Sequence, residues 1–231
     1  SSTEEFNNGL DMSGEGGLIV TKFTSDTADW AWVDSERGTS KTIKTNSDAG
    51  EVSNEPWIQS FDNDGFTHGT YIGTGDDGDV ASWSFRKCPG FLDVVTYTGN
   101  GTAGREISHS LGSTPGMVIV KRTNTTEDWT VFHRGLWTSK VIDLNKNAAS
   151  HNSGDVFDTT APTSTVFTVG SSARVNANGS TYVAYIFAHD DQSFGDDSDE
   201  AIIKCDTFTI SGSGTFDVNN LGFEPQFVMY K

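Results

Sequence analysis

The chain has 231 residues and a formal net charge of −17, from 32 acidic and 15 basic side chains. A surface this acidic repels the phosphates of nucleic acids and anionic membranes, so neither is an expected partner. No apolar run reaches the ~18–20 residues of a membrane span, and no signal peptide precedes the first strand-like segment. Because the chain begins at Ser1 and ends inside a strand-like segment, we expect a piece of a longer chain.

An internal repeat sets the architecture. Residues 17–46 align without a gap to residues 116–145, and 11 of the 30 aligned residues are identical. The identical pairs are Gly17/Gly116, Lys22/Lys121, Thr24/Thr123, Thr27/Thr126, Asp29/Asp128, Trp30/Trp129, Thr39/Thr138, Ser40/Ser139, Lys41/Lys140, Ile43/Ile142 and Asn46/Asn145. Such self-similarity indicates a repeated structural unit, and roughly 100 residues are enough for each unit to bury its own core.

Strand-like segments separated by turn residues follow one another along both copies. In the first copy we expect strands at residues 17–23, 30–33, 41–45, 57–61, 65–71 and 80–85. In the second copy we expect them at residues 91–97, 106–110, 117–122, 129–133, 140–144, 164–169 and 181–188. No segment has convincing helical periodicity. The pattern predicts an all-β chain of tandem antiparallel β-sandwich modules, jelly-roll-like and about 100 residues each.

The repeat also predicts which aromatic residues occupy equivalent places. Residues 81–85 match residues 183–187, so Trp83 should superimpose on Tyr185, as Trp30 should on Trp129. We expect all of these rings to lie in the module cores, since a shared core role explains an aromatic residue that recurs at one repeat position.

The acidic, Gly-containing segment 189–200 suggests a module boundary, because boundaries favour polar linkers. We therefore divide the chain into a first module at 1–89 that lacks its first strand, a complete second module at 90–190, and a linker with the opening strands of a third copy at 191–231.

Two segments near the C-terminus support a third copy. Residues 202–209 restart the pattern of residues 93–98, and residues 221–231 restart that of residues 111–121. We expect Ile202–Thr209 to pair with residues 1–89 or with another chain. In the alternative division, modules begin at Gly17 and Gly116, and residues 202–222 close the second sandwich.

The ordered set of motifs from residue 91 to residue 190 resembles a repeated β-module in virion proteins of tailed phages, especially marine ones. The landmarks are Val-Val-Thr-Tyr-Thr-Gly-Asn-Gly at 94–101, Ile-Ser-His-Ser-Leu-Gly at 107–112, Pro-Gly-Met-Val-Ile-Val-Lys-Arg at 115–122, Ala-Pro-Thr-Ser-Thr-Val-Phe-Thr-Val-Gly at 161–170 and Tyr-Val-Ala-Tyr-Ile-Phe-Ala-His-Asp at 182–190. The resemblance implies a structural or adhesive role in a tail fibre or elsewhere on the virion surface, and it implies no catalytic residues.

Acidic turns offer the main candidate metal ligands, and His189-Asp190-Asp191 is a weaker candidate. Their carboxylates are hard oxygen ligands of the kind that Ca²⁺ takes, but no turn has the twelve-residue EF-hand pattern. Asp and Gly are also common in turns for backbone reasons alone. The candidate ligands are Asp62, Asp64, Asp76, Asp77 and Asp79. We otherwise expect no cofactor.

Two tryptophans are the candidate ligand-binding residues, Trp137 and Trp57. Trp137 aligns with Gly38, so the shared fold does not require it, although its neighbour Leu136 favours local packing instead. The two cysteines, Cys88 and Cys205, do not occupy matching repeat positions, so we expect free and mostly buried thiols.

These observations favour a non-enzymatic structural protein of a phage virion, made in the host cytoplasm and located in the particle. It would contact other virion proteins, copies of itself and a host-surface glycan, and contribute to attachment or particle architecture. A calcium-assisted carbohydrate-binding module is the alternative. A polysaccharide-degrading enzyme is the third hypothesis, but no nucleophile–base or spaced-metal motif supports it.

Overall fold

The computed structural model of the chain describes residues 4–25, 27–55, 57–69, 79–136, 140–152, 154–196, 199–210, 212, 218 and 221–231. Within these residues nearly all regular structure is β, in four antiparallel sheets. The prediction of an all-β sandwich fold is therefore confirmed. Two short helical segments, η1 (Arg134–Leu136) and α1 (Ala173–Asn176), interrupt the strands.

The first half of the molecule, strands β1 to β8, contains a five-stranded and a three-stranded sheet. The orders are β5-β4-β3-β2-β8 and β1-β7-β6. The strands are β1 (Glu4–Asn7), β2 (Gly17–Phe23), β3 (Ala31–Asp34), β4 (Lys41–Lys44), β5 (Val52–Ser53), β6 (Ile58–Asp62), β7 (Gly65–His68) and β8 (Val80–Arg86).

The second half, strands β9 to β16, contains a six-stranded and a two-stranded sheet. The orders are β14-β13-β12-β11-β16-β9 and β10-β15. The strands are β9 (Leu92–Thr98), β10 (Arg105–Ser108), β11 (Met117–Arg122), β12 (Thr130–His133), β13 (Lys140–Asp143), β14 (His151–Asn152), β15 (Val166–Val169) and β16 (Thr181–Phe187).

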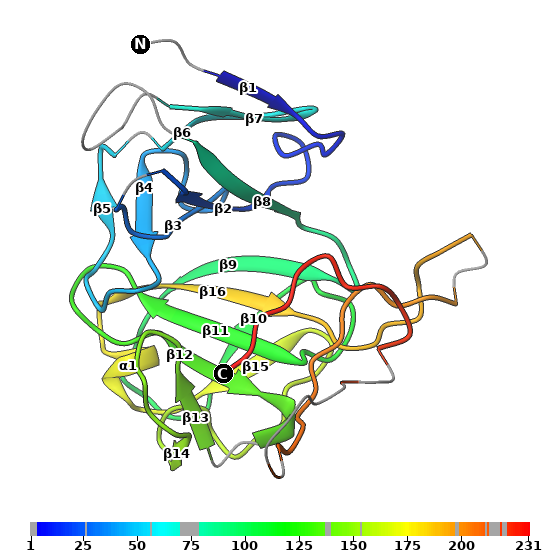
Figure 1. The fold of residues 1–231 in the computed structure, drawn as a ribbon. Coiled ribbons are helices and arrows are strands. Elements are labelled where there is room, and N and C mark those ends of the chain that lie inside the picture. Colours follow the sequence, from blue (N-terminus) through cyan, green and yellow to red (C-terminus); the bar gives the residue numbers. More distant parts are fainter. Residues whose placement is uncertain are drawn as a thin grey trace.

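The four sheets stack as layers, with the five- and six-stranded sheets in the middle (Figure 1). Three apolar clusters fill the spaces between successive layers. The middle cluster, here called the junction layer, joins the two halves. Its buried members are Leu18, Val20, Trp32, Ile43, Leu92, Val94, Ile119, Trp129, Val131, Val183, Tyr185 and Phe187.

This stacking explains why β2 and β11 are continuous apolar runs rather than alternating ones. Successive side chains of a strand point to opposite faces of the sheet. In β2, Leu18 and Val20 therefore enter the junction layer while Ile19 enters the outer core of the first half. Both faces of the sheet are covered, so both sets of side chains must be apolar.

The hydrogen-bonding pattern of the first half recurs in the second. Val20 on β2 pairs with Trp83 on β8, and Ile119 on β11 pairs with Tyr185 on β16. Val20 and Ile119 are aligned in the repeat, so Trp83 and Tyr185 occupy equivalent strand positions, as predicted. The small sheets of the two halves also share a pairing: β1 pairs with β7 in the first half, and β10 pairs with β15 in the second.

The halves differ at one edge of the large sheets. In the second half β9 pairs along the whole of β16, whereas β8 is the edge strand of its sheet. The jelly-roll part of the prediction is not supported, because β11 to β14 are adjacent in chain order within one sheet, as in a meander.

The prediction that Trp30 and Trp129 share a core environment is wrong. Trp129 is fully buried in the junction layer, but Trp30 is 36% exposed. Trp30 packs at a tilt on Trp83, itself half-buried, with ring centroids 5.6 Å apart. The same repeat position is thus interior in one half and on the surface in the other, because only Trp129 is covered by the other half.

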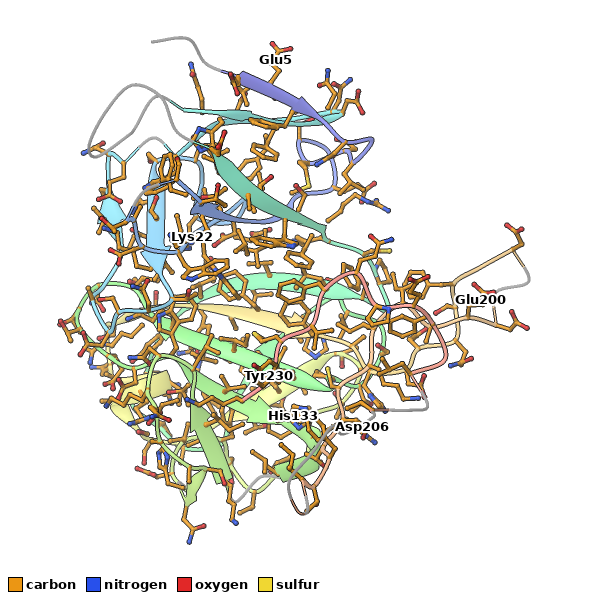
Figure 2. All side chains as sticks on the ribbon, in the orientation of Figure 1. Glu5, Lys22, His133, Glu200, Asp206 and Tyr230 are labelled. Atoms are coloured by element: carbon orange, nitrogen blue, oxygen red, sulfur yellow. The ribbon has the colours of Figure 1, made fainter. Side chains whose placement is uncertain are left out.

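The expected pairing of Ile202–Thr209 is also wrong. This segment forms no strand, and the carbonyl of Ile203 accepts a hydrogen bond from Asp190 N at 2.9 Å. Cys205 N donates to His189 Nδ1 at 3.0 Å, so the segment lies against the end of β16. Figure 2 shows Asp206 beside His133 of β12, in agreement with this placement. The bounds of the modules remain a prediction.

The two thiols are free, with Cys205 buried and Cys88 half-buried. Among the described residues, no helix is long and apolar enough to cross a membrane.

Truncating the two repeated tryptophans should have unequal effects on stability. We expect Trp129→Ala to lower the free energy of unfolding by about 3–5 kcal/mol, because it opens a cavity in the junction layer. The matched control Trp30→Ala should cost only about 1–2 kcal/mol, since its ring is 36% exposed. Urea denaturation followed by circular dichroism measures both, and equal losses would contradict this account of the junction layer.

Candidate functional site

The junction between the two halves holds the most elaborate arrangement of side chains in the described part of the chain. Trp32 comes from β3, and its ring meets two rings of the second half edge-on. The centroid distances are 5.4 Å to Trp129 and 5.0 Å to Tyr185. Trp129 and Tyr185 are themselves stacked at 6.4 Å. Edge-to-face contacts of this kind add to the hydrophobic attraction and fix the relative orientation of the rings.

A buried polar cluster lies beside these rings. Tyr185 Oη donates to Asp34 Oδ2 at 2.8 Å, and Arg37 Nε donates to the same oxygen at 2.7 Å. Arg37 Nη2 donates to Tyr185 Oη at 3.2 Å and to Trp32 O at 3.1 Å, while Nη1 donates to Glu51 Oε2 at 3.2 Å. The cluster therefore ties a hydroxyl of the second half to an ion pair of the first.

The protonation states in this cluster follow from burial and from charge. Burial raises the pKa of Tyr185 well above its ordinary value, so its hydroxyl stays a donor. Burial opposes the charge of Arg37, but the neighbouring Tyr185, Asp34 and Glu51 outweigh it and hold the pKa of the guanidinium above its usual range. An unpaired charge at this depth would be costly, and the pairing removes that cost.

The last residue of β4 and the loop that leads to β5, residues 44–51, dock onto the second half and are here called the first docking loop (Figure 1). Its carbonyls accept hydrogen bonds from two side chains that the other half provides. Trp129 Nε1 donates to Lys44 O and Ser47 O, both at 3.1 Å, and Lys121 Nζ donates to Asp48 O at 3.1 Å.

Backbone contacts complete the docking. Glu51 N donates to Thr123 O at 2.7 Å, and Glu127 N donates to Asp48 O at 2.8 Å. We call Lys121, Thr123 and Trp129 the docking socket of the second half. All three are buried, and the socket satisfies the loop carbonyls that the junction removes from water.

Lys121 is the least expected member of the socket, since its side chain is fully buried. Its ammonium group also donates to Arg122 O and Glu127 O, each at 2.9 Å. Burial lowers the pKa of Lys121 to about 8, and the negative charges of Glu127, Asp48 and Asp128 oppose that shift. The three carbonyl contacts take up the three donors of the ammonium group.

A cleft of about 360 Å³ opens at the edge of the junction. Lys87 bridges its two sides, with Nζ 2.7 Å from Glu36 Oε1 and 3.3 Å from Asp93 Oδ1. Asp93 is buried and also accepts from Ser110 N at 2.7 Å. These charges are paired with one another, and no serine hydroxyl among the described residues hydrogen-bonds to His109, which lines the same cleft. The arrangement joins the halves and provides no nucleophile–base pair.

The structure describes one of the two predicted ligand-binding tryptophans. Trp57 is 3% exposed and packs in the outer core of the first half, 5.3 Å from Phe23. Its Nε1 donates to Glu55 Oε2 at 3.2 Å. Because the ring is buried, it has no open face on which a ligand could stack, and this prediction is wrong. Trp137 lies outside the described residues.

The acidic turns serve the backbone. Asp62 Oδ2 accepts from Thr67 Oγ1 at 2.8 Å, and Asp64 Oδ1 accepts from Gly9 N at 2.9 Å. Asp79 O accepts from Thr24 N and Asp79 N donates to Ser25 Oγ, both at 2.8 Å, so the main chain of Asp79 joins the β7–β8 connection to the β2–β3 connection. Asp76 and Asp77 lie outside the described residues. In the part of the chain that the structure describes, no group of three or more His, Cys, Asp or Glu could hold a metal ion.

Sequence reasoning missed both buried cations of the junction. The identity of Lys22 and Lys121 in the repeat was the available signal for the socket. Arg37 gave none, because its partner Tyr185 is 148 residues away in the chain.

These features define an all-β protein of stacked antiparallel sheets whose most developed chemistry lies between the two large sheets. The chain belongs to the family described as domain of unknown function DUF7483, whose model matches residues 73–231. No curated protein and no solved structure matches the chain.

Replacing Arg37 tests the buried cluster. Arg37→Ala leaves Asp34 buried without its cation, so we expect a loss of about 3–5 kcal/mol in the free energy of unfolding. The control is Lys41→Ala. Lys41 pairs with Glu51, but its side chain is 39% exposed, so its removal should cost less than about 1 kcal/mol. Urea denaturation gives both values, and a small loss for Arg37→Ala would mean that the cluster does not hold the halves together.

The histidine of the cleft should make stability depend on pH. Burial lowers the pKa of His109 below its ordinary value of 6.5, although Asp93 and nearby carbonyls oppose this. The unfolded chain then binds a proton more readily than the folded one, so stability falls as pH falls through and below 6.5. Denaturation at about pH 7.5 and about pH 5.5 measures the change, and His109→Gln should reduce it.

Proposed function

We propose that the protein is a non-enzymatic structural protein of a phage virion, in a tail fibre or elsewhere on the particle surface. There it contributes to attachment to the host surface or to the architecture of the particle. It is made in the host cytoplasm and works in the particle, in contact with other virion proteins, with copies of itself and with a host-surface glycan.

The observation that carries the proposal is the continuous buried layer between the two large sheets. A flexible tandem array would join its units through a polar linker and leave their faces wet. Here Trp32, Trp129 and Tyr185 interlock in a layer whose aliphatic neighbours are also buried, so the two sandwiches behave as one stiff block. A stiff block built from a repeated unit suits a part that must hold its shape.

Two further observations support the same role. The ordered motifs of residues 91–190 resemble a repeated β-module of tailed-phage virion proteins. The charged groups of the cleft at the edge of the junction are engaged with one another, as in the bridge from Lys87 to Glu36 and Asp93. Groups that are already paired hold a structure together and are poorly placed to bind a substrate.

Localisation and turnover test the proposal together. We expect antibodies against the purified protein to label intact particles at the tail or surface, with preimmune serum as the control. We also expect the purified protein to release no sugar from a bacterial surface polysaccharide. Particles that carry no label, or polysaccharide turnover that a single Asp or Glu substitution abolishes, would contradict the proposal.

A further inference from the structure

The repeat places a second docking socket on the first half. Lys121, Thr123 and Trp129 of the second half align with identical residues of the first. The aligned residues are Lys22, Thr24 and Trp30. These three are here called the first-half socket.

The first-half socket has the geometry of its counterpart without its cover. Lys22 Nζ donates to Phe23 O at 2.7 Å, just as Lys121 Nζ donates to Arg122 O at 2.9 Å. Whereas Lys121 is fully buried, Lys22 is half-buried and Thr24 is exposed.

The aromatic part of the socket is also repeated. The rings of Trp30 and Trp83 pack at a tilt with centroids 5.6 Å apart, and the equivalent pair in the second half, Trp129 and Tyr185, is stacked with centroids 6.4 Å apart. The ring of Trp30 is 36% exposed, against 0% for Trp129. The difference in exposure arises because the first docking loop covers Trp129 and nothing equivalent covers Trp30 among the described residues.

A second docking loop is present as well. Residues 143–150 of the second half align with residues 44–51 of the first, and residues 146–149 are exposed. An asparagine holds both loops in the same way. Asn145 accepts from Trp129 N at 3.0 Å and donates to Asp128 Oδ1 at 3.0 Å. In the first loop, Asn46 accepts from Trp30 N at 3.2 Å and donates to Asp29 Oδ1 at 2.7 Å.

A third lysine supports the assignment of the second loop. Lys231 aligns with Lys121 in the third copy of the repeat, and its ammonium group donates to the carbonyl of Lys146 in the second loop. Lys146 is equivalent to Ser47, whose carbonyl accepts from Trp129. Two lysines at the same repeat position thus contact two docking loops at neighbouring carbonyls. The tail around Tyr230 lies over the second half in Figure 2, where it reaches this loop.

We infer that the first-half socket of Lys22, Thr24 and Trp30 binds the second docking loop, residues 143–150, of another copy of this chain. In the complex Lys22 Nζ and Trp30 Nε1 donate to carbonyls of the loop, as Lys121 and Trp129 do within one chain. The inference rests on the proposed structural role and names the contact through which copies associate.

The contact is head-to-tail, because the loop of one copy meets the socket of another. Figure 1 shows β13 and β14, which flank the second docking loop, at the end of the molecule away from β2 and β3, which flank the first-half socket. One chain cannot close the contact on itself, so each bound copy presents a new loop and a new socket. Heterologous contacts that do not close into a ring build filaments.

One residue of the second loop fits less well than its counterpart. A Cβ added at Gly50 would lie 2.8 Å from Thr123 O, so the first loop needs glycine for its close approach. The second loop has Ala149 at this position. Association should therefore be weak in the natural chain, and the Lys231 contact weakens it further because it competes for the same loop.

The test uses full-length chains and sedimentation velocity. We expect Ala149→Gly combined with Lys231→Ala to strengthen association by roughly tenfold, the size of a modest overpacking penalty, and to give species larger than dimers. Adding Trp30→Ala should weaken association about thirtyfold, the effect of losing an interface hot spot. Trp30→Phe, which keeps a ring but loses the N–H donor, should fall between the two. Circular dichroism confirms that each variant is folded.

A mixing experiment tests the head-to-tail geometry. A Trp30→Ala chain that also carries Ala149→Gly and Lys231→Ala keeps the strengthened loop but lacks a socket. An Ala149→Arg chain keeps the socket but lacks a usable loop. Each alone should stay monomeric, and the mixture should form a one-to-one complex that grows no further. A double variant that remains monomeric, a Trp30→Ala chain that still associates, or a mixture without the heterodimer would overturn the inference.

Failure of this contact and failure of the proposed function give different results. Particles labelled by antibody together with a monomeric double variant would leave the structural role standing and refute only the socket. Unlabelled particles together with a double variant that associates would leave the socket standing and refute the structural role.

Discussion

The contact on which the rest of the structure depends is the one between Tyr185 and the Arg37–Asp34 pair. The junction layer around it supplies attraction, but apolar contact has no preferred direction and would tolerate several rotations of one sheet on the other. Hydrogen bonds between Tyr185 Oη, Asp34 Oδ2 and Arg37 are satisfied in one arrangement only. Breaking them would leave a charged pair and a hydroxyl buried without a bridging partner.

That single arrangement also decides which residues are covered. With the sheets held in this rotation, the first docking loop reaches Lys121 and Trp129, and the equivalent loop of the second half does not reach Lys22 and Trp30. A two-fold symmetric contact would have covered both sockets or neither. The asymmetry of one buried cluster thus leaves an open socket on the surface.

The sequence was a good guide to the strands and a poor guide to burial. The repeat correctly identified Trp83 and Tyr185 as equivalent strand positions, because register depends on local alternation and on pairing within one half. It misplaced Trp30, since exposure at that position depends on the other half. The prediction for Trp57 failed for a different reason. Trp57 packs on Phe23 within its own half, and a lone tryptophan in a strand-like segment does not show which face of the sheet it is on.

The junction itself could not be predicted from the pattern of the chain. Arg37 and Tyr185 are far apart in sequence, and nothing in a single sequence links them. The acidic segment after residue 188 suggested a module boundary at that point. The most extensive contact between the halves lies elsewhere, between the faces of the two large sheets.

The junction has two kinds of polar contact, the socket and the buried ion pair, and only the residues of the socket recur in both halves. The socket residues are the same in both halves, but Asp34 and Arg37 align with His133 and Leu136, which cannot reproduce the ion pair. Both halves carry the socket residues, but only the first half has the ion pair that binds the hydroxyl of Tyr185 in the second half. The two halves are consequently not interchangeable, and their order along the polypeptide is encoded in two side chains.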